Sequence, residues 1–209
     1  MLAVQGRKHS LFLGIESRAV ELYHFSDVGD IEVFVPRAPL RHPHAEPLVY
    51  AMSEWESPLY LFPRDCPRIA TWVTGETTEA DCEDFFARGP ARIKCFIDRG
   101  FELRWRTGLI YRYTFDSEGF ENCHDYGDWI CRTAQRPIRV ELIDNLPAAA
   151  EMHGMLVEVV DSLVDLGHRV YDFTAMRWTT TLHVSMVRMG LLPGWEHSTS
   201  KPVRTGVKH

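Results

Sequence analysis

The chain has 209 residues, of which 45% are hydrophobic and 25% are charged, and its formal net charge is −6. This length and composition predict one globular domain with a sizeable core and exclude a disordered or low-complexity chain. The acidic balance disfavours nucleic acid or an anionic membrane as the main partner, because both need a basic surface.

Two further features of the composition concern the compartment. The five cysteines are odd in number and form no C-x-x-C pair, so a disulfide framework is not expected. The apolar segment near the N-terminus is too short for a signal peptide, and no run is long enough for a membrane span. We therefore expect a cytoplasmic protein with a single domain over residues 1–209, in which 1–18 form an extension and 200–209 a polar tail.

The first half of the chain alternates short strands with turns. Apolar and polar residues alternate over residues 20–25, which predicts a strand, and a turn follows at 26–30. The loop at 39–47 carries three prolines and is expected to be exposed. Further predictions are a short apolar stretch at 31–35, strands at 47–52 and 69–73, a helix at 54–61, and a helix that begins at 77 or 78 and ends at 89.

The second half predicts a sheet and one long helix. Strands are expected at 93–97, 109–115 and 137–143. Apolar residues recur at intervals of three and four over 148–166, which indicates a helix. The segment 180–185 favours a strand over a helix. These elements predict an α+β fold: a compact split barrel of mostly antiparallel strands, with short helices and one long C-terminal helix.

The sequence contains none of four common catalytic motifs. It has no G-x-x-x-x-G-K-[ST], G-x-G-x-x-G, G-x-S-x-G or H-E-x-x-H. His42 and His44 lie in a proline-rich loop at a spacing that fits no standard metal-ligand pair, so no metal is expected. Cys123 and His124 are neighbours, and adjacent side chains usually point apart; we interpret them as loop residues.

Several short motifs occur in a fixed order. They are Tyr23-His24 at a strand end, Val49-Tyr50-Ala51 at the end of a strand, Ile110-Tyr111-Arg112-Tyr113 in a strand, Phe120-Glu121 in an acidic loop, and Pro137-Ile138-Arg139-Val140 in a last strand. In this order residues 20–145 resemble the ADP-ribosyltransferase fold of the rifampin-modifying and related bacterial enzymes. The stretch 59–68 also resembles an uncharacterised bacterial domain family.

The resemblance implies NAD as a substrate and transfer of ADP-ribose to an acceptor that the sequence does not identify. His24 would bond a ribose hydroxyl and Tyr50 would stack on the nicotinamide ring. Related enzymes have Gly-Thr after the histidine, and Phe25-Ser26, which stand there in this chain, are predicted to bind the cofactor together with His24 and Tyr50. The position that stabilises the transition state has three candidates: Glu121, Asp125 and Gln135.

Three arginines, Arg37, Arg64 and Arg68, each follow a proline and are suited to binding phosphate. The alternative is that each pairs with a nearby carboxylate. Likewise, His24 and its aromatic neighbours are interpreted either as site residues or as ordinary core. Two other functions therefore stay open: a non-catalytic nucleotide- or ligand-binding module of the same fold, and another enzyme acting on phosphorylated or nucleoside substrates.

Overall fold

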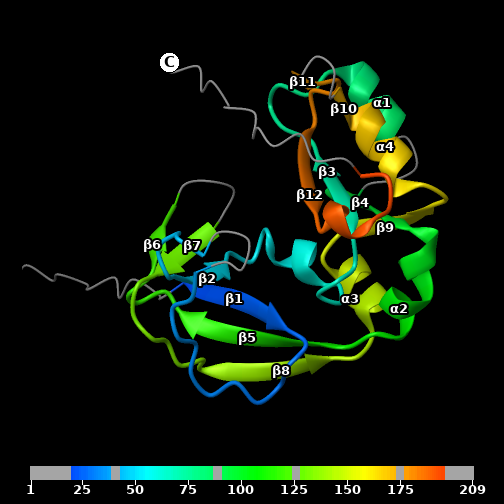
Figure 1. The fold of residues 1–209 in the computed structure, drawn as a ribbon. Helices are drawn as coiled ribbons and strands as arrows, with labels where there is room; N and C mark the ends of the chain where they lie inside the picture. Colours follow the sequence, from blue (N-terminus) through cyan, green and yellow to red (C-terminus); the bar gives the residue numbers. More distant parts are fainter. Residues whose placement is uncertain (1–19, 39–42, 87–90, 124–127, 173–176, 196–209) are drawn as a thin grey trace, which may run out of the picture.

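The structure is a computed structural model that describes residues 20–38, 43–86, 91–123, 128–172 and 177–195. In these residues the protein is α+β, with mostly antiparallel strands in two main sheets and four short α-helices (Figure 1). The predicted fold class is confirmed to this extent. The strands of these segments do not close into a barrel.

The larger sheet has six strands in the order β6-β7-β2-β1-β5-β8, all antiparallel. All six residues of β1 pair with β5, whereas β1 and β2 share a single register pair, Tyr23 with Met52. The end of β1 is therefore bound to a neighbour on one side only. The strands are β1 (Glu21–Ser26), β2 (Val49–Met52), β5 (Ile110–Asp116), β6 (Glu121–Asn122), β7 (Asp128–Cys131) and β8 (Arg139–Ile143).

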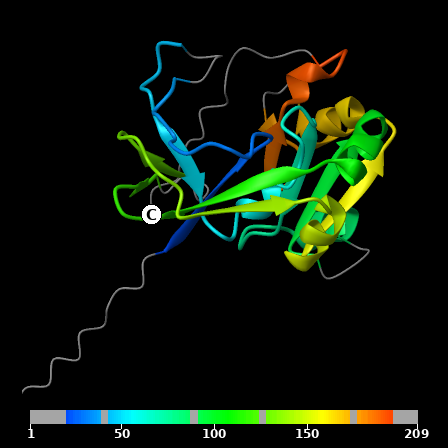
Figure 2. The same ribbon diagram turned by 90° about the horizontal axis from the view of Figure 1, so that it is seen from below.

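The smaller sheet has the order β12-β3-β4-β9, and its β4–β9 pair is parallel. Figures 1 and 2 show it beside the six-stranded sheet, with helices on both of its faces. Its strands are β3 (Arg68–Trp72), β4 (Ile93–Asp98), β9 (Met155–Val160) and β12 (His183–Val187), and a separate ribbon is formed by β10 (Tyr171–Asp172) and β11 (Arg177–Trp178).

Alternation along β3 and β4 sends side chains into two cores, which explains why both strands are buried on both faces. Ile69 and Phe96 pack with α1 (Glu79–Phe86) and α4 (Leu163–Val170). Ala70 and Cys95 pack with α2 (Glu102–Thr107) and α3 (Leu146–Met152). Ile110 of β5 joins the second core, so this core connects the two sheets.

The predicted helix over 148–166 is wrong. Residues 146–170 form α3, then β9, then α4. Gly154 follows α3 with a φ of +70°, a conformation that no helix interior contains. The hydroxyl of Ser162 accepts the Asp165 N–H at 3.1 Å and so begins a new helix. Each of these three elements buries some of its own apolar residues, and together these residues happen to recur at intervals of three and four.

Most of the other predicted elements are present in the structure, and a few differ. The strands expected at 20–25, 47–52, 69–73, 93–97, 109–115, 137–143 and 180–185 are confirmed with small shifts as β1, β2, β3, β4, β5, β8 and β12, and the helix from 77 or 78 as α1. The expected helix at 54–61 is only the 3-10 turn η1 (Ser57–Tyr60), because Pro58 removes a backbone donor. Phe34 forms an isolated bridge instead of a strand, and α2 was not predicted.

Three observations bear on compartment and cofactors. No helix in the described segments is long and apolar enough to cross a membrane. No disulfide joins any of the five cysteines, all of which lie in the described segments. Among the described residues, no three His, Cys, Asp or Glu side chains lie together as metal ligands would. The expected N-terminal extension and C-terminal tail lie outside the described residues.

Candidate functional site

A groove of about 200 Å³ lies where the end of β1 meets the start of β3 and the end of β12. Three of its side chains are arginines, and we call it the arginine groove. Its lining residues are His24, Phe25, Ser26, Asp27, Tyr60, Phe62, Arg64, Arg68, Ile110, Val187 and Arg188.

Arg68 is the most unusual member, because it is a charged residue with only 4% of its surface exposed. Its Nε donates to the carbonyl of Leu59 at 2.8 Å and its Nη1 to that of Cys66 at 3.1 Å. The guanidinium carbon lies 4.9 Å from the ring centroid of Phe62. Among the described residues no carboxylate pairs with Arg68, and burial lowers its pKa. A buried cation without a counter-charge is unfavourable unless an anion joins it.

The other two arginines of the groove lie at its rim. Arg64 and Arg188 are exposed, and neither forms an ion pair with a carboxylate of the described chain. Arg188 Nε donates to the carbonyl of Arg64 at 3.2 Å, and the charge of Arg188 also lowers the pKa of Arg68, after burial. The one carboxylate in the lining belongs to Asp27, which accepts the backbone N–H of Arg64 at 3.3 Å. The groove therefore has an excess of positive charge.

Arg188 is also strained. Its φ of 58° is in the left-handed region, which no other non-glycine residue of the described segments adopts. This conformation costs about 1–2 kcal/mol in a residue with a side chain. Arg188 directly follows β12, and its left-handed conformation reverses the chain at the rim of the groove.

His24 lines the groove, and its ring is held by a contact to the backbone. Its Nδ1 lies 2.8 Å from the carbonyl oxygen of Tyr50. A carbonyl oxygen only accepts, so Nδ1 carries the hydrogen and a neutral ring keeps a lone pair on Nε2. Burial lowers the pKa of His24 by more than the bond to the Tyr50 carbonyl raises it, and the charge of Arg64 lowers it further, which favours the neutral ring. Such a nitrogen accepts a hydrogen bond from a hydroxyl group.

Aromatic rings form the apolar side of the groove. The rings of Phe25 and Tyr60 are stacked, with centroids 6.2 Å apart and planes 13° apart. Burial raises the pKa of Tyr60, which keeps its hydroxyl protonated. A planar ring of a ligand fits such a surface, but sites that enclose a whole drug-sized ligand measure roughly 300–1,000 Å³. At about 200 Å³ the groove is smaller than such sites.

The structure brings together five of the residues predicted to bind a cofactor: His24, Phe25, Ser26, Arg64 and Arg68. Arg37 is elsewhere, in a backbone bridge to Leu48. Tyr50 reaches His24 through its carbonyl, while its side chain is 39% exposed and is not among the groove residues.

The two described candidates for the remaining catalytic position, Glu121 and Gln135, do not line the groove. Glu121 is exposed on β6 and pairs with Arg132 at 2.7 Å. Gln135 donates from Nε2 to the sulfur of Cys131 at 2.9 Å. Asp125 lies outside the described residues.

Sequence reasoning missed six groove residues, and three of these, Asp27, Tyr60 and Arg188, carry polar side chains. Asp27 directly follows the predicted first strand, and Tyr60 lies in the stretch 59–68 that was already distinctive. Both positions therefore had a local signal. Arg188 had none, because only the pairing of β12 with β3 brings it close to Arg68.

Comparison with known proteins gives one match. A family model described as "Family of unknown function (DUF6886)" matches residues 23–191. No curated protein and no solved structure matches the chain. The matched span includes every residue of the arginine groove.

Proposed function

Because the chain belongs to DUF6886, a family of unknown function, we propose its function from the chemistry of the arginine groove: the protein binds a nucleotide through a phosphate group. The observation that carries this proposal is Arg68, a buried guanidinium without a carboxylate partner among the described residues. A phosphate oxygen supplies the missing negative charge and accepts the N–H groups that the two carbonyls leave free.

Two further features favour a nucleotide over a simple phosphate. The Phe25–Tyr60 pair offers a flat apolar surface for a base or a nicotinamide ring. The Nε2 atom of His24 is an acceptor for a ribose hydroxyl. Phosphate, sugar and ring each have a matching group in a single groove, with the bulk of the ligand at its open side.

We propose NAD as the nucleotide, on the basis of the resemblance to ADP-ribosyltransferases. In that reaction the bond between the ribose C1′ and nicotinamide breaks, and a nucleophile of the acceptor bonds to C1′ and loses a proton. The groove offers Asp27 as its carboxylate, whereas Glu121 is held by Arg132. The geometry supports nucleotide binding more directly than catalysis, so the non-catalytic nucleotide-binding module is the second candidate.

A thermal-shift titration tests the binding. NAD and ADP-ribose are expected to raise the melting temperature by about 3–5 °C at ten times their Kd, since that excess stabilises the native state by about 1.4 kcal/mol. Adenosine, which lacks phosphate, should give a much smaller shift. No shift with millimolar NAD or ADP-ribose would contradict the proposal.

Variants of the two rim arginines locate the site. Arg64→Ala and Arg188→Ala should each weaken binding of ADP-ribose about tenfold or more, because each removes a charge-assisted hydrogen bond. Arg99→Ala is the matched control: Arg99 is also exposed but pairs with Asp161 outside the groove. If all three variants bind alike, the phosphate lies elsewhere.

Release of nicotinamide from NAD separates the transferase from the binding module. A transferase should release nicotinamide in the presence of an acceptor, and His24→Ala should reduce that rate more than it reduces binding of ADP-ribose. Stoichiometric NAD binding without any release would favour the module.

A further inference from the structure

The strand β8 forms one edge of the six-stranded sheet (Figure 1). It pairs with β5 on one side, and no strand of the described segments pairs with it on the other. A row of its backbone N–H and C=O groups is therefore open to another strand. The opposite edge of the sheet is the two-residue strand β6. Of the two edges that the described strands form, that at β8 is the one long enough to accept a further strand over several residues.

The apolar side chains of this edge are exposed. Val140 is 43% and Leu142 is 54% exposed, and Ile138, directly before the strand, is 61% exposed. Val140 and Leu142 pair with Tyr113 and Tyr111, so both lie on one face of the sheet. An edge strand with exposed apolar side chains is a template for pairing with another chain.

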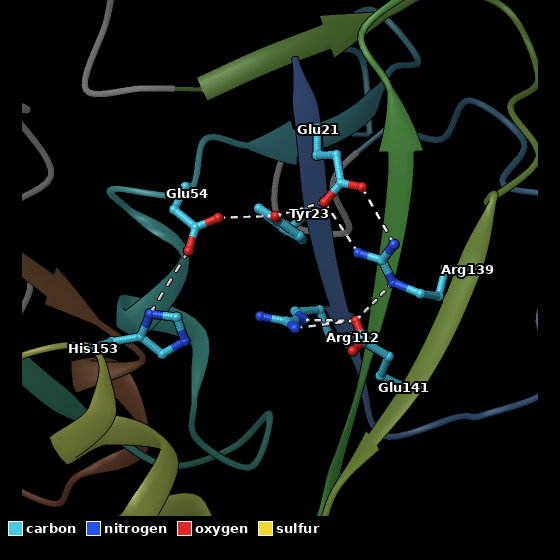
Figure 3. Close-up of polar contacts among 7 residues, drawn as sticks. All are labelled: Glu21, Tyr23, Glu54, Arg112, Arg139, Glu141 and His153. Atoms are coloured by element: carbon cyan, nitrogen blue, oxygen red, sulfur yellow. Dashed lines mark hydrogen bonds and ion pairs between the residues drawn. The ribbon is translucent and has the colours of Figure 1, made fainter. Parts of the chain in front are cut away.

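The other face of β8 carries charges of both signs (Figure 3). Arg139 bonds Glu21 at 3.0 and 3.2 Å, and its Nε donates to Glu141 at 3.2 Å. Arg112 donates to Glu141 at 3.1 and 3.2 Å. The side chains of Arg139 and Glu141 are nevertheless 44% and 37% exposed, so each retains surface for a further partner. At this open edge β8 therefore presents a positive and a negative side chain two residues apart.

This spacing makes the edge complementary to a second copy of itself. When two identical strands pair antiparallel about a two-fold axis, one residue position lies on the axis. With Val140 on the axis, Arg139 of each copy lies opposite Glu141 of the other, so opposite charges meet twice. On the other face Val140 meets its own counterpart, and Leu142 meets Ile138. Opposite charges and apolar pairs directly across two strands both stabilise the pairing.

The neighbouring registers lack this complementarity. With Arg139 or Glu141 on the axis, that residue meets its own counterpart, and like charges lie opposite each other. An axis between two residues is excluded, because residues that face each other in an antiparallel pair both direct their N–H groups toward the partner strand or both away from it. The charges therefore favour the register centred on Val140.

We propose that two copies of this chain pair through β8, centred on Val140, and so join their six-stranded sheets into one continuous sheet. A contact of one short strand is small compared with the roughly 1,200–2,000 Å² that stable interfaces bury, so the dimer is in equilibrium with the monomer. None of the residues of this contact lines the arginine groove. The proposal therefore does not depend on nucleotide binding.

The mass in solution tests the dimer. In sedimentation velocity of the full chain without nucleotide, the weight-average mass should rise from 24.1 kDa toward twice that value as the concentration increases to about 0.5 mM. Val140→Lys should raise the dissociation constant of the dimer about tenfold or more, because a lysine at the centre of the contact opposes strand pairing. Leu156→Lys is the matched control and should have no effect, because Leu156 is 40% exposed on β9, an edge of the smaller sheet.

Charge reversal tests the register. Arg139→Glu leaves two acidic positions on the strand and Glu141→Arg leaves two basic ones, so each variant alone should dimerise about tenfold or more weakly than wild type. An equimolar mixture of the two variants should form a heterodimer about as tightly as wild type dimerises, because opposite charges then meet at both pairs. A folding defect in either variant would not produce this recovery.

Three results would overturn the proposal. The first is a wild-type chain that stays monomeric up to about 0.5 mM. The second is a dimer that Val140→Lys weakens no more than Leu156→Lys does. The third is a mixture of the charge variants that associates no better than each variant alone. Since no nucleotide is present, failure of the nucleotide proposal would not produce any of these results.

Discussion

At the scale of single residues, the proposed phosphate site depends most on Arg68. Its side chain is buried against Phe62 and bonded to two carbonyl groups, neither of which neutralises its charge. Buried charges in proteins are normally paired, and an unpaired one is retained at a large loss of solvation. An anionic ligand that supplies the missing counter-charge would account for the buried guanidinium group of Arg68.

The first prediction follows from this charge. Inorganic phosphate should raise the urea midpoint of the wild-type protein relative to chloride at equal ionic strength, because an anion that binds only the native state stabilises it. Arg68→Met, which removes the charge and keeps a side chain of similar reach, should abolish the difference, and Arg99→Met should retain it. A phosphate effect of equal size in Arg68→Met would show that the anion binds elsewhere.

The second prediction concerns pH. Burial lowers the pKa of His183, which stacks on Trp72 at 4.0 Å, to about 4, against 6.5 for an ordinary histidine. The unfolded chain therefore takes up this proton first, and stability falls as the pH falls from about 6.5 toward 4, by at most roughly 3 kcal/mol. His183→Gln should lose less stability than wild type between pH 7 and pH 5. His44→Gln, at an exposed position, should behave as wild type; equal pH dependence in all three proteins would contradict the assignment.

At the scale of elements, residues 146–170 show what periodicity leaves out. The apolar spacing in this segment fits one amphipathic helix, yet the chain turns twice and inserts β9 between α3 and α4. Parallel pairing of β9 with β4 buries Met155 and extends the smaller sheet, a long-range contact that no local pattern contains. The signals that did exist were Gly154 and Ser162, at the two breaks.

One glycine substitution distinguishes the two arrangements by its sign. At φ +70°, Gly154→Ala should destabilise the protein by about 1 kcal/mol, because an L-residue is strained there. Within a continuous helix the same change would stabilise by about 1 kcal/mol. Gly75→Ala is the control, since a Cβ at Gly75 meets nothing within 4 Å and its φ is not positive; it should be neutral or slightly stabilising. Urea unfolding of wild type, Gly154→Ala and Gly75→Ala measures these differences in the free energy of unfolding.

At the scale of the whole molecule, the arginine groove lies at the junction of the two sheets. Its residues come from the end of β1, from the stretch 59–68, from the start of β5 and from the end of β12, segments that are distant in sequence. The strand pattern and the residues near Tyr23-His24 were predictable, because alternation and proline turns are local. The place of Arg188 in the groove and the ion pair of Glu121 with Arg132 were not predictable, because both depend on how distant strands pair.

The most direct test of the nucleotide site is a titration of the ¹⁵N-labelled protein with NAD, followed by amide chemical shifts. We expect saturable changes at residues 24–27, at Arg64 and at Arg188, which line the groove, and small changes on α1 and α4. Arg64→Ala should reduce the affinity and perturb the same residues. Absence of saturable shifts at millimolar NAD, or saturable shifts confined to residues outside the groove, would contradict binding of NAD in the arginine groove.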